Sequence, residues 1–301
     1  MRTDPQISIV IYVKNGAETI ARAVDSALAQ TGARRELVVV DGASTDGTLE
    51  KLRSYGSSID VLISEPDAGA FEAANKGWRA ARAPVICYLM ADDWLEPDAA
   101  RAVVEAFGRN PEAGIVSSGG RVVEEQENGR FQTVYERRGE ENPLSLETLL
   151  DIPMTGSRYW RKETLAALGG FSDRYRFAHD RDLLVRALIS RVPSAVVDEI
   201  LYTYRRHAGS RTLSGDRSVS RAFLDEHRVM SERWLQMANL SARDASRILA
   251  WRRQQFAEAF LLDFAAGRWS KVARALLEDP WVFPVATGLT FSRWRNARRT
   301  D

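Results

Sequence analysis

Residues 85–93 read VICYLMADD, and this stretch decides the fold class of the 301-residue chain. Six apolar residues lead into two adjacent carboxylates, and Trp94, Leu95 and Pro97 follow. A continuous apolar run of this length is typical of a strand that is buried on both faces of a parallel sheet. The carboxylates then lie at the carboxyl end of that strand, which is the edge where open α/β sheets bind their ligands.

Asp92 and Asp93 at such an edge favour a cation site. Hard divalent cations take oxygen ligands, and Mg²⁺ is commonly held by one or two carboxylates together with substrate phosphates. The pair therefore predicts a site for a metal and a diphosphate. A plainer alternative stays open, because two aspartates shortly before Pro97 can also cap the helix that starts there.

A second apolar run also ends on a carboxylate. Residues 36–48 read ELVVVDGASTDGT, in which Asp41 follows the apolar run and two glycines permit a tight turn. Asp41 is therefore a second candidate ligand at a strand end, with turn formation alone as the alternative. The segment lacks the Gly-Lys-Ser/Thr ending of a Walker loop, and no GxGxxG follows the first apolar run.

Apolar periodicity predicts that strands and helices alternate in the first half of the chain. Strands are expected at residues 7–13, 37–40, 61–63 and 85–90, with a helix after each of them. Such alternation predicts a parallel sheet with helices on its faces. Two β-rich runs, at 115–123 and 131–135, predict a surface hairpin, and the chain becomes helical beyond residue 216.

Six short segments of the first hundred residues form an ordered set. They are 9–16 (IVIYVKNG), 27–30 (ALAQ), 40–48 (VDGASTDGT), 64–69 (SEPDAG), 75–77 (NKG) and 91–93 (ADD). In this order and spacing they resemble the family 2 glycosyltransferases of the GT-A fold. The resemblance implies an α/β GT-A domain, Rossmann-like with a mainly parallel sheet flanked by helices. We expect this domain at 1–215, with a nucleotide-binding half at 1–110, an acceptor-binding half at 111–215, and a helical region at 216–301.

The same resemblance implies an activity. It is that of an inverting glycosyltransferase, which moves a sugar from a nucleotide sugar, first of all a UDP-sugar, to a hydroxyl of a glycan or lipid-linked acceptor in surface polysaccharide or glycolipid assembly. A divalent cation, Mn²⁺ or Mg²⁺, would neutralise charge on the leaving diphosphate. Two other classes stay open: a noncatalytic nucleotide- or glycan-binding scaffold on this fold, and a nucleotidyltransferase. The latter usually carries a Gly-rich loop with Arg and Lys after the first strand, which residues 14–18 (KNGAE) do not match.

The resemblance also assigns roles to the acids at the strand ends. Asp41 would contact the base or ribose, Asp92 the ribose or the metal shell, and Asp93 the metal and the β-phosphate. Three further candidates for nucleotide contact are Lys14, Asp67 and Lys76. For these three, a solvated surface position is the alternative.

The acceptor hydroxyl needs a base, because its proton must leave as the bond to the anomeric carbon forms. The family keeps an acid after a Gly-Gly-Phe turn and before a helix, and here 169–171 and Asp180 match that pattern. His179 stands where the family often has Glu. In the alternative, Asp180 caps the helix and Asp182 pairs with Arg186 at i,i+4.

Two other segments extend the expected site. Gly156 would allow a close approach of the backbone to a sugar. Residues 204–210 (YRRHAGS) resemble the family's Tyr-Arg-x-His segment. His207 is expected to reach the metal or a phosphate, with a structural role as the alternative, and Arg205 or Arg206 to hold phosphate.

Composition excludes some classes of protein. With 42 basic and 41 acidic residues the net charge is +1, so no global field recruits nucleic acid. Cys87, the only cysteine, lies within an apolar run and is expected in the core, not in a disulfide. The N-terminus lacks the apolar core of a signal peptide, and no run approaches the roughly 20 apolar residues that span a bilayer. The expected location is the cytoplasm, or the inner face of the membrane.

The C-terminal residues differ in character from the rest. Residues 241–301 hold eleven basic against six acidic residues, and 281–294 is apolar, bordered by arginines. Apolar surface beside arginines suits an anionic membrane interface. Peripheral membrane contact is therefore one expectation for this region, and a domain or homodimer contact is the other.

Overall fold

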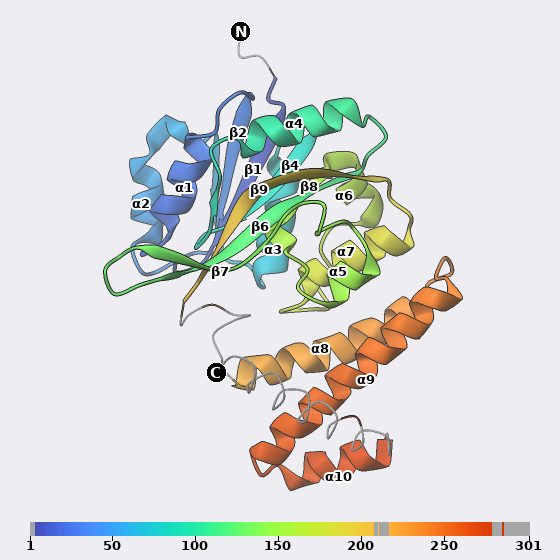
Figure 1. Cartoon of the computed structure of the whole chain (residues 1–301). Helices are drawn as coiled ribbons and strands as arrows, with labels where there is room; N and C mark the ends of the chain where they lie inside the picture. Colours follow the sequence, from blue (N-terminus) through green and yellow to red (C-terminus); the bar gives the residue numbers. More distant parts are fainter. Residues whose placement is uncertain (1–3, 208–209, 211–216, 279–284, 286–301) are drawn as a thin grey trace. The chain divides into compact units, whose positions relative to one another are not determined.

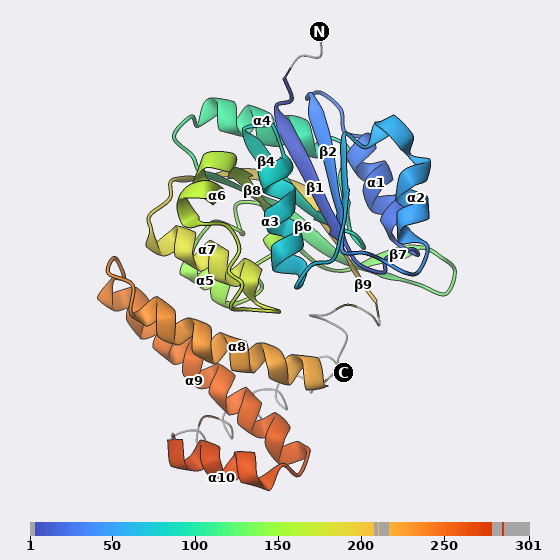
Figure 2. The same ribbon diagram turned by 180° about the vertical axis from the view of Figure 1, so that it is seen from behind.

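The computed structural model describes residues 4–207, 210, 217–278 and 285. The chain divides into two compact units, one up to Ser210 and one from Arg211 onward. Figures 1 and 2 show the two units from opposite sides, a sheet with helices for the first and helices alone for the second.

Four parallel strands form the first half of the sheet. They are β1 (Ile7–Val13), β2 (Arg35–Asp41), β3 (Val61–Ser64) and β4 (Val85–Met90). Their spatial order is β3-β2-β1-β4, and the register places Val13 opposite Asp41 and Asp41 opposite Ser64. The strands predicted from apolar periodicity are confirmed, and their carboxyl ends meet at one edge.

The connecting helices cover both faces of this sheet. They are α1 (Ile20–Leu28), α2 (Thr48–Ser54), α3 (Ala70–Ala80) and α4 (Ala99–Arg109). A short 3₁₀ turn, Gly56–Ser58, follows α2. Ile9 and Ile11 pack in one core with apolar residues of α1 and α4. Val10 points to the other face, where a Cβ on Gly77 of α3 would lie 2.2 Å from its side chain. Alternate residues of one strand thus hold helices on opposite faces, as a doubly covered parallel sheet requires.

Five more strands extend the sheet. They are β5 (Trp94–Leu95), β6 (Ile115–Glu125), β7 (Phe131–Arg137), β8 (Arg158–Arg161) and β9 (Ser194–Arg206). β8 is antiparallel to both β4 and β6, β9 is parallel to β6, and β5 is antiparallel to β9. The hairpin of β6 and β7 is confirmed, but its placement on the surface is wrong for β6, which is mostly buried because it also pairs with β8 and β9.

Short helices connect the strands of this second half. They are α5 (Leu146–Leu150), the 3₁₀ turn Thr155–Ser157, α6 (Lys162–Leu168) and α7 (His179–Ile189). The N-cap of α4 is Asp98, and β5 separates Asp92 and Asp93 from that helix. The alternative in which the aspartate pair caps the helix after Pro97 is therefore wrong. Cys87 is buried in β4, as expected, and burial raises the pKa of its thiol.

The second unit consists of helices over its described residues. They are α8 (Arg217–Leu235), α9 (Ala242–Ala265) and α10 (Trp269–Glu278). Ser241 is the N-cap of α9, and its hydroxyl accepts the Asp244 N–H at 3.1 Å. The Trp234 and Trp251 rings stack 5.9 Å apart. The expected apolar stretch 281–294 lies outside the described residues apart from Val285. None of the described helices is both long enough and apolar enough to cross a membrane.

Candidate active site

Hydrogen bonds join the loops that follow β1 and β2 at the carboxyl edge of the sheet. The Asn15 N–H donates to Ser44 Oγ at 2.8 Å, and Asn15 Oδ1 accepts the Thr45 N–H at 2.9 Å. Asn15 (φ 54°) and Ala43 (φ 56°) have left-handed backbone. For residues other than glycine this conformation costs about 1–3 kcal/mol and is concentrated at functional sites. These hydrogen bonds hold the two loops together, and we call the pair of loops the braced rim. No sequence pattern predicted this feature.

Asp41 lies beneath this rim and is fully buried. Its carboxylate accepts the Ser44 N–H at 3.2 Å and the Ser64 hydroxyl at 2.7 Å. These contacts agree with a turn-shaping role, and they also hold the carboxylate at the strand end where a ligand would bind.

Asp67 and Lys14 lie next to the glycine that follows Asp41. A Cβ on Gly42 would lie 2.3 Å from Asp67 Oδ2 and 3.4 Å from Lys14 Cβ, so glycine is required for this close approach. Three of the sequence candidates, Lys14, Asp41 and Asp67, are thus brought together around Gly42.

Lys76 contacts nearby residues of the loop after β3 and of its own helix, α3. Its ammonium donates to the Pro66 carbonyl at 2.9 Å and pairs with Glu65 at 2.9 Å and with Glu72 at 3.2 Å. Hydrogen bonding to Glu65 is the main cause that raises the pKa of Lys76. These contacts tie α3 to the loop after β3, so the structure favours a bracing role for Lys76 over nucleotide contact.

Asp92 and His207 meet at the ends of β4 and β9. Asp92 Oδ2 lies 3.0 Å from His207 Nε2, and about 30% of each side chain is exposed (31% and 29%). The His207 N–H donates to the buried Ser210 hydroxyl at 2.9 Å. A carboxylate oxygen and an imidazole nitrogen therefore reach the same partly open place from segments 115 residues apart.

Asp93 faces inward, in contrast to Asp92. It is fully buried, its Oδ2 accepts the Tyr202 hydroxyl, and its Oδ1 accepts the Arg205 N–H at 2.9 Å. Burial, helped by the negative charge of Asp92, raises the pKa of Asp93 well above its usual range. Asp93 is therefore less open to a cation than Asp92, because it is buried and both of its oxygens already accept hydrogen bonds.

Gly156 allows a close approach to Tyr202. A Cβ at this position would lie 2.2 Å from the Tyr202 ring, so any larger residue would displace that ring. The close approach expected for a sugar is thus occupied by a side chain of the protein. Sequence patterns did not single out Tyr202, and its place in an apolar strand, two residues before Tyr204, carried no signal of this contact.

Arg205 and Arg206 form ion pairs with glutamates of β6, the strand next to β9. Arg205 Nη2 lies 2.6 Å from Glu125 Oε2, and Arg206 pairs with Glu124. A phosphate would have to compete with these glutamates for either guanidinium group.

The expected base lies at the start of α7. Asp180 Oδ1 accepts the N–H of Arg181 at 2.7 Å. The N-cap of α7 is Ala178, so the alternative in which Asp180 caps this helix is wrong. Asp182 pairs with Arg186 at 2.7 Å, which confirms that part of the alternative, and Arg186 also donates to the Gly170 carbonyl at 2.8 Å. His179 is buried, with its ring 5.5 Å from that of Phe171, so it packs where the family often has a carboxylate.

Asn75 connects the Gly-Gly-Phe turn to the nucleotide half. Its amide donates to the Phe171 carbonyl at 2.8 Å and accepts the Phe171 N–H at 3.0 Å, across 96 residues. It also accepts from Trp78 Nε1 at 2.9 Å. The pair to Phe171 joins positions 96 residues apart, so local sequence patterns carry no signal of it.

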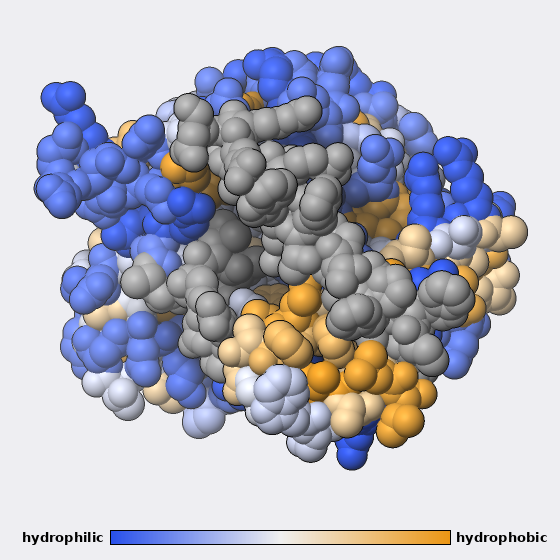
Figure 3. Space-filling view, turned by 60° about the horizontal axis from the view of Figure 1, so that its bottom comes forward, coloured by the Kyte–Doolittle hydropathy of each residue, from blue (hydrophilic) through white to orange (hydrophobic). Residues whose placement is uncertain are grey.

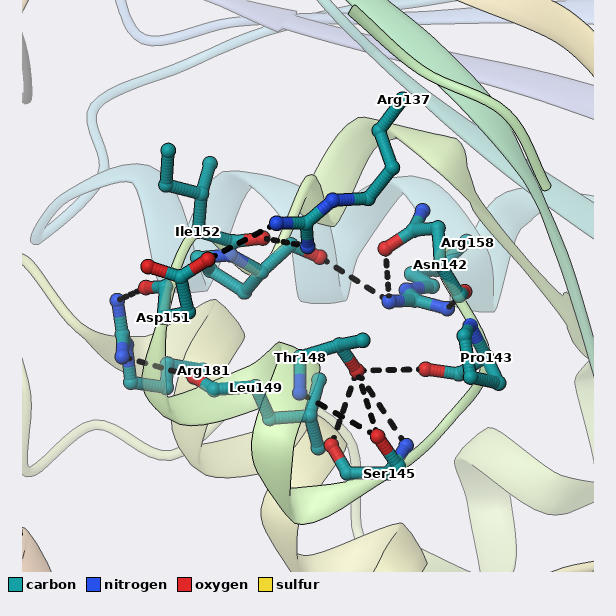
Figure 4. A network of polar contacts seen from close by, with 11 residues as sticks. Arg137, Asn142, Pro143, Ser145, Thr148, Leu149, Asp151, Ile152, Arg158 and Arg181 are labelled. Carbon is teal, nitrogen blue, oxygen red and sulfur yellow. Dashed lines mark hydrogen bonds and ion pairs between the residues drawn. The ribbon is translucent and has the colours of Figure 1, made fainter. Parts of the chain in front are cut away.

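Three arginines surround the segment 149–153 beside α5 (Figure 4). Arg137 bonds Asp151 at 2.9 Å, Arg181 bonds the Leu149 carbonyl at 2.8 Å, and the buried Arg158 bonds Asn142 Oδ1 at 2.7 Å. Burial lowers the pKa of Arg158 to about 9. A hollow of about 630 Å³ adjoins this network; its lining includes Tyr135, Arg137, Glu141, Ser145, Thr148 and Asp151.

The family model described as glycosyl transferase family 2 matches residues 8–169, which is more than half of the chain. The chain belongs to glycosyl transferase family 2. An uncharacterized glycosyltransferase of Rickettsia prowazekii is 30% identical over 214 residues, which cover 69% of this family 2 chain and 66% of the relative. The chain therefore matches about two thirds of that relative's length.

Solved structures show the fold of this family 2 protein. S. aureus TarS in complex with UDP-GlcNAc superposes with a TM-score of 0.64 at 17% identity, over 86% of this chain and 73% of that chain. The mannosyltransferase of Pyrobaculum calidifontis in complex with GDP-Man and Mn²⁺ gives a TM-score of 0.59 at 17% identity, over 95% and 84%. The GT-A fold implied by the sequence resemblance is confirmed.

Proposed function

We propose that this family 2 protein transfers a sugar from a nucleotide-sugar donor to an acceptor hydroxyl, with inversion at the anomeric carbon. The observation that carries the proposal is the meeting of Asp92 and His207 at the edge of the sheet where Asp41 also lies. That edge is where α/β sheets of this type bind ligands. A UDP-sugar is the first donor to test, because the similar TarS structure contains UDP-GlcNAc.

A divalent cation, Mn²⁺ or Mg²⁺, fits best at Asp92 and His207. Among the residues that the structure describes, no group of three or more His, Cys, Asp and Glu side chains is arranged to hold a metal. The protein would thus supply two ligands and leave the others to diphosphate oxygens and water, as is common for Mg²⁺. When bound, the cation stabilises charge on the leaving diphosphate. Asp93 then acts as a positioning residue, because both of its oxygens are turned inward.

The nucleoside would bind along the braced rim. Asp67 supplies a carboxylate beside Gly42, Lys14 is exposed at the same place, and the buried Asp41 would contact the nucleoside only if it released Ser44 or Ser64. In this assignment Lys76 keeps the loop after β3 in place, and Arg205 or Arg206 contacts phosphate only if it leaves its glutamate partner.

Asp180 is proposed as the base that takes the proton of the acceptor hydroxyl. Its helix is held to the Gly-Gly-Phe turn by Arg186, and that turn is held to α3 by Asn75. Two linked sets of hydrogen bonds thus fix the start of α7 relative to the nucleotide half. Fixed geometry matters because attack requires the hydroxyl and the base within hydrogen-bond reach.

The acceptor is proposed to be a glycan or a lipid-linked glycan, as in surface polysaccharide or glycolipid assembly at the inner face of a membrane. The hollow beside α5 lies in the proposed acceptor half, 111–215, and offers carboxylate, hydroxyl and guanidinium groups that suit a sugar chain. The nucleotide half would span 1–110 and the helical region 216–301.

The proposal is tested with a panel of nucleotides. UDP, GDP, dTDP and CMP are each titrated by calorimetry, with and without Mn²⁺. We expect one nucleotide to bind, and to bind more tightly with the metal. If no nucleotide binds under any condition, the result supports the noncatalytic scaffold. Release of pyrophosphate from a supplied substrate would indicate a nucleotidyltransferase.

Tyr202→Phe tests the positioning role of Asp93. The variant removes the hydroxyl that donates to a buried carboxyl group, which costs about 1–3 kcal/mol. We therefore expect a lower thermal unfolding midpoint and about tenfold weaker Mn²⁺-dependent nucleotide binding, since supporting contacts of a metal site are worth about 10–100-fold in affinity.

Tyr88→Phe is the matched control for Tyr202→Phe. Tyr88 is buried on β4, and its hydroxyl has no hydrogen-bond partner among the described residues. This control is expected to leave both measurements unchanged. Nucleotide binding equal to that of the wild type in Tyr202→Phe would contradict the positioning role.

A further inference from the structure

The end of the β6–β7 hairpin packs against α1 and β5. Phe131, the first residue of β7, meets the Trp94 ring edge-to-face, with the ring centres 5.0 Å apart. The Arg22 guanidinium of α1 lies over both rings, 4.4 Å from the centre of Phe131 and 5.0 Å from that of Trp94. A guanidinium within about 6 Å of a ring centre is attracted to the ring. We call Arg22, Trp94 and Phe131 the aromatic clamp, which joins elements that are distant in sequence (Figure 1).

α1 also holds the two residues that follow the clamp tryptophan. Ser26, one helical turn after Arg22, accepts the Leu95 N–H through its hydroxyl at 3.3 Å. The Gln30 amide, just beyond the end of α1, donates to the Glu96 carbonyl at 2.9 Å. Side chains four positions apart lie on one face of a helix. α1 and the residues after it therefore anchor the chain directly after the turn that carries the aspartate pair.

The same end of the hairpin contacts the segment that carries His207. Glu125, the last residue of β6, lies opposite Phe131 in the hairpin and pairs with Arg205 at 2.6 Å. Arg205 comes two residues before His207, and the clamp tryptophan comes two residues after Asp92. The end of one hairpin therefore contacts both segments that bring the proposed cation ligands together.

Contacts of defined geometry distinguish the aromatic clamp from the apolar side chains that gather on the face shown in Figure 3. Both rings of the clamp are half-buried, whereas Arg22 is exposed and keeps its charge in contact with water. A two-stranded hairpin is only marginally stable in water by itself. The clamp therefore supplies packing that keeps the end of this hairpin in place.

We propose that Phe131 and Arg22 are positioning residues for Asp92, and that the end of the hairpin sets how Asp92 faces His207. The inference rests on the proposed function, in which these two side chains bind the cation. Supporting contacts of a metal site fix the geometry of its ligands, and their loss typically lowers metal affinity by about 10–100-fold. A clamp that served folding alone would change stability and leave the metal dependence of nucleotide binding as it is.

Phe131→Ala tests the proposal by calorimetry with UDP, GDP, dTDP and CMP, each with and without Mn²⁺. We expect Mn²⁺-dependent binding to weaken about tenfold and metal-free binding to stay within about twofold, because the clamp acts on a metal ligand and not on the braced rim. Phe131→Tyr keeps the ring and should bind like the wild type. Val134→Ala is the matched control, since Val134 is also apolar and is 41% exposed on β7. It should bind like the wild type as well.

Hydrogen–deuterium exchange of the ligand-free chain gives a second readout. In Phe131→Ala the amides of residues 92–95 should exchange about tenfold faster than in the wild type, because exchange reports local opening. Val134→Ala should leave them unchanged. Wild-type exchange in Phe131→Ala, or equal weakening of metal-dependent and metal-free binding, would overturn the proposal. If the wild type binds no nucleotide, the proposed function fails, and exchange at 92–95 alone decides whether the clamp holds the turn that carries Asp92.

Discussion

We expect Asp180→Asn to lower kcat/KM for sugar transfer by about 10²–10⁴-fold, the range typical of a lost general base. The amide keeps the size of the side chain and can still accept the Arg181 N–H, but it cannot take up a proton. Nucleotide affinity should stay within about twofold, because the base acts on the acceptor and not on the nucleotide. Steady-state kinetics with the donor found in the nucleotide panel, together with calorimetry, measures both quantities.

Asp173→Asn provides the matched control for this substitution. Asp173 is exposed in the same turn region, seven residues before Asp180. It is expected to leave turnover unchanged. If Asp180→Asn is as active as Asp173→Asn and only its thermal unfolding midpoint falls, then Asp180 has a structural role at the start of α7 and the base lies elsewhere.

We expect Asp92→Asn to weaken Mn²⁺-dependent nucleotide binding by about 100-fold or more. The substitution removes one of two protein ligands and the charge that attracts the cation, a larger loss than the 10–100-fold typical of supporting residues. Binding without metal should change little. Calorimetry with the nucleotide found in the panel, with and without Mn²⁺, separates the two effects.

Asp93→Asn distinguishes ligand from positioning residue. Because Asp93 is buried and faces Tyr202 and the Arg205 N–H, its amide variant should mainly lower the free energy of unfolding, by about 1–3 kcal/mol, with a smaller loss in metal-dependent binding. In the reverse pattern, Asp93→Asn abolishes metal-dependent binding and Asp92→Asn does not. That result would identify Asp93 as the metal ligand instead.

The order of strands and helices in the first hundred residues could be predicted because it depends on local patterns. Apolar runs and 3.6-residue periodicity report burial of one segment at a time. The burial of β6 could not be predicted in this way, since β6 is covered by β8 and β9, whose paired residues lie 41 or more positions further along the chain.

The sequence by itself determined the fold class, the family and the location of acids at the ends of β2 and β4, because a parallel strand carries its carboxyl end to a known edge of the sheet. Only the tertiary structure decided which acid of the pair turns outward. Asp92 meets His207 across 115 residues, whereas Asp93 meets Tyr202 across 109. The two aspartates lie in the turn between β4 and β5, and the packing of β9, with Gly156 making room for Tyr202, selects which one is buried.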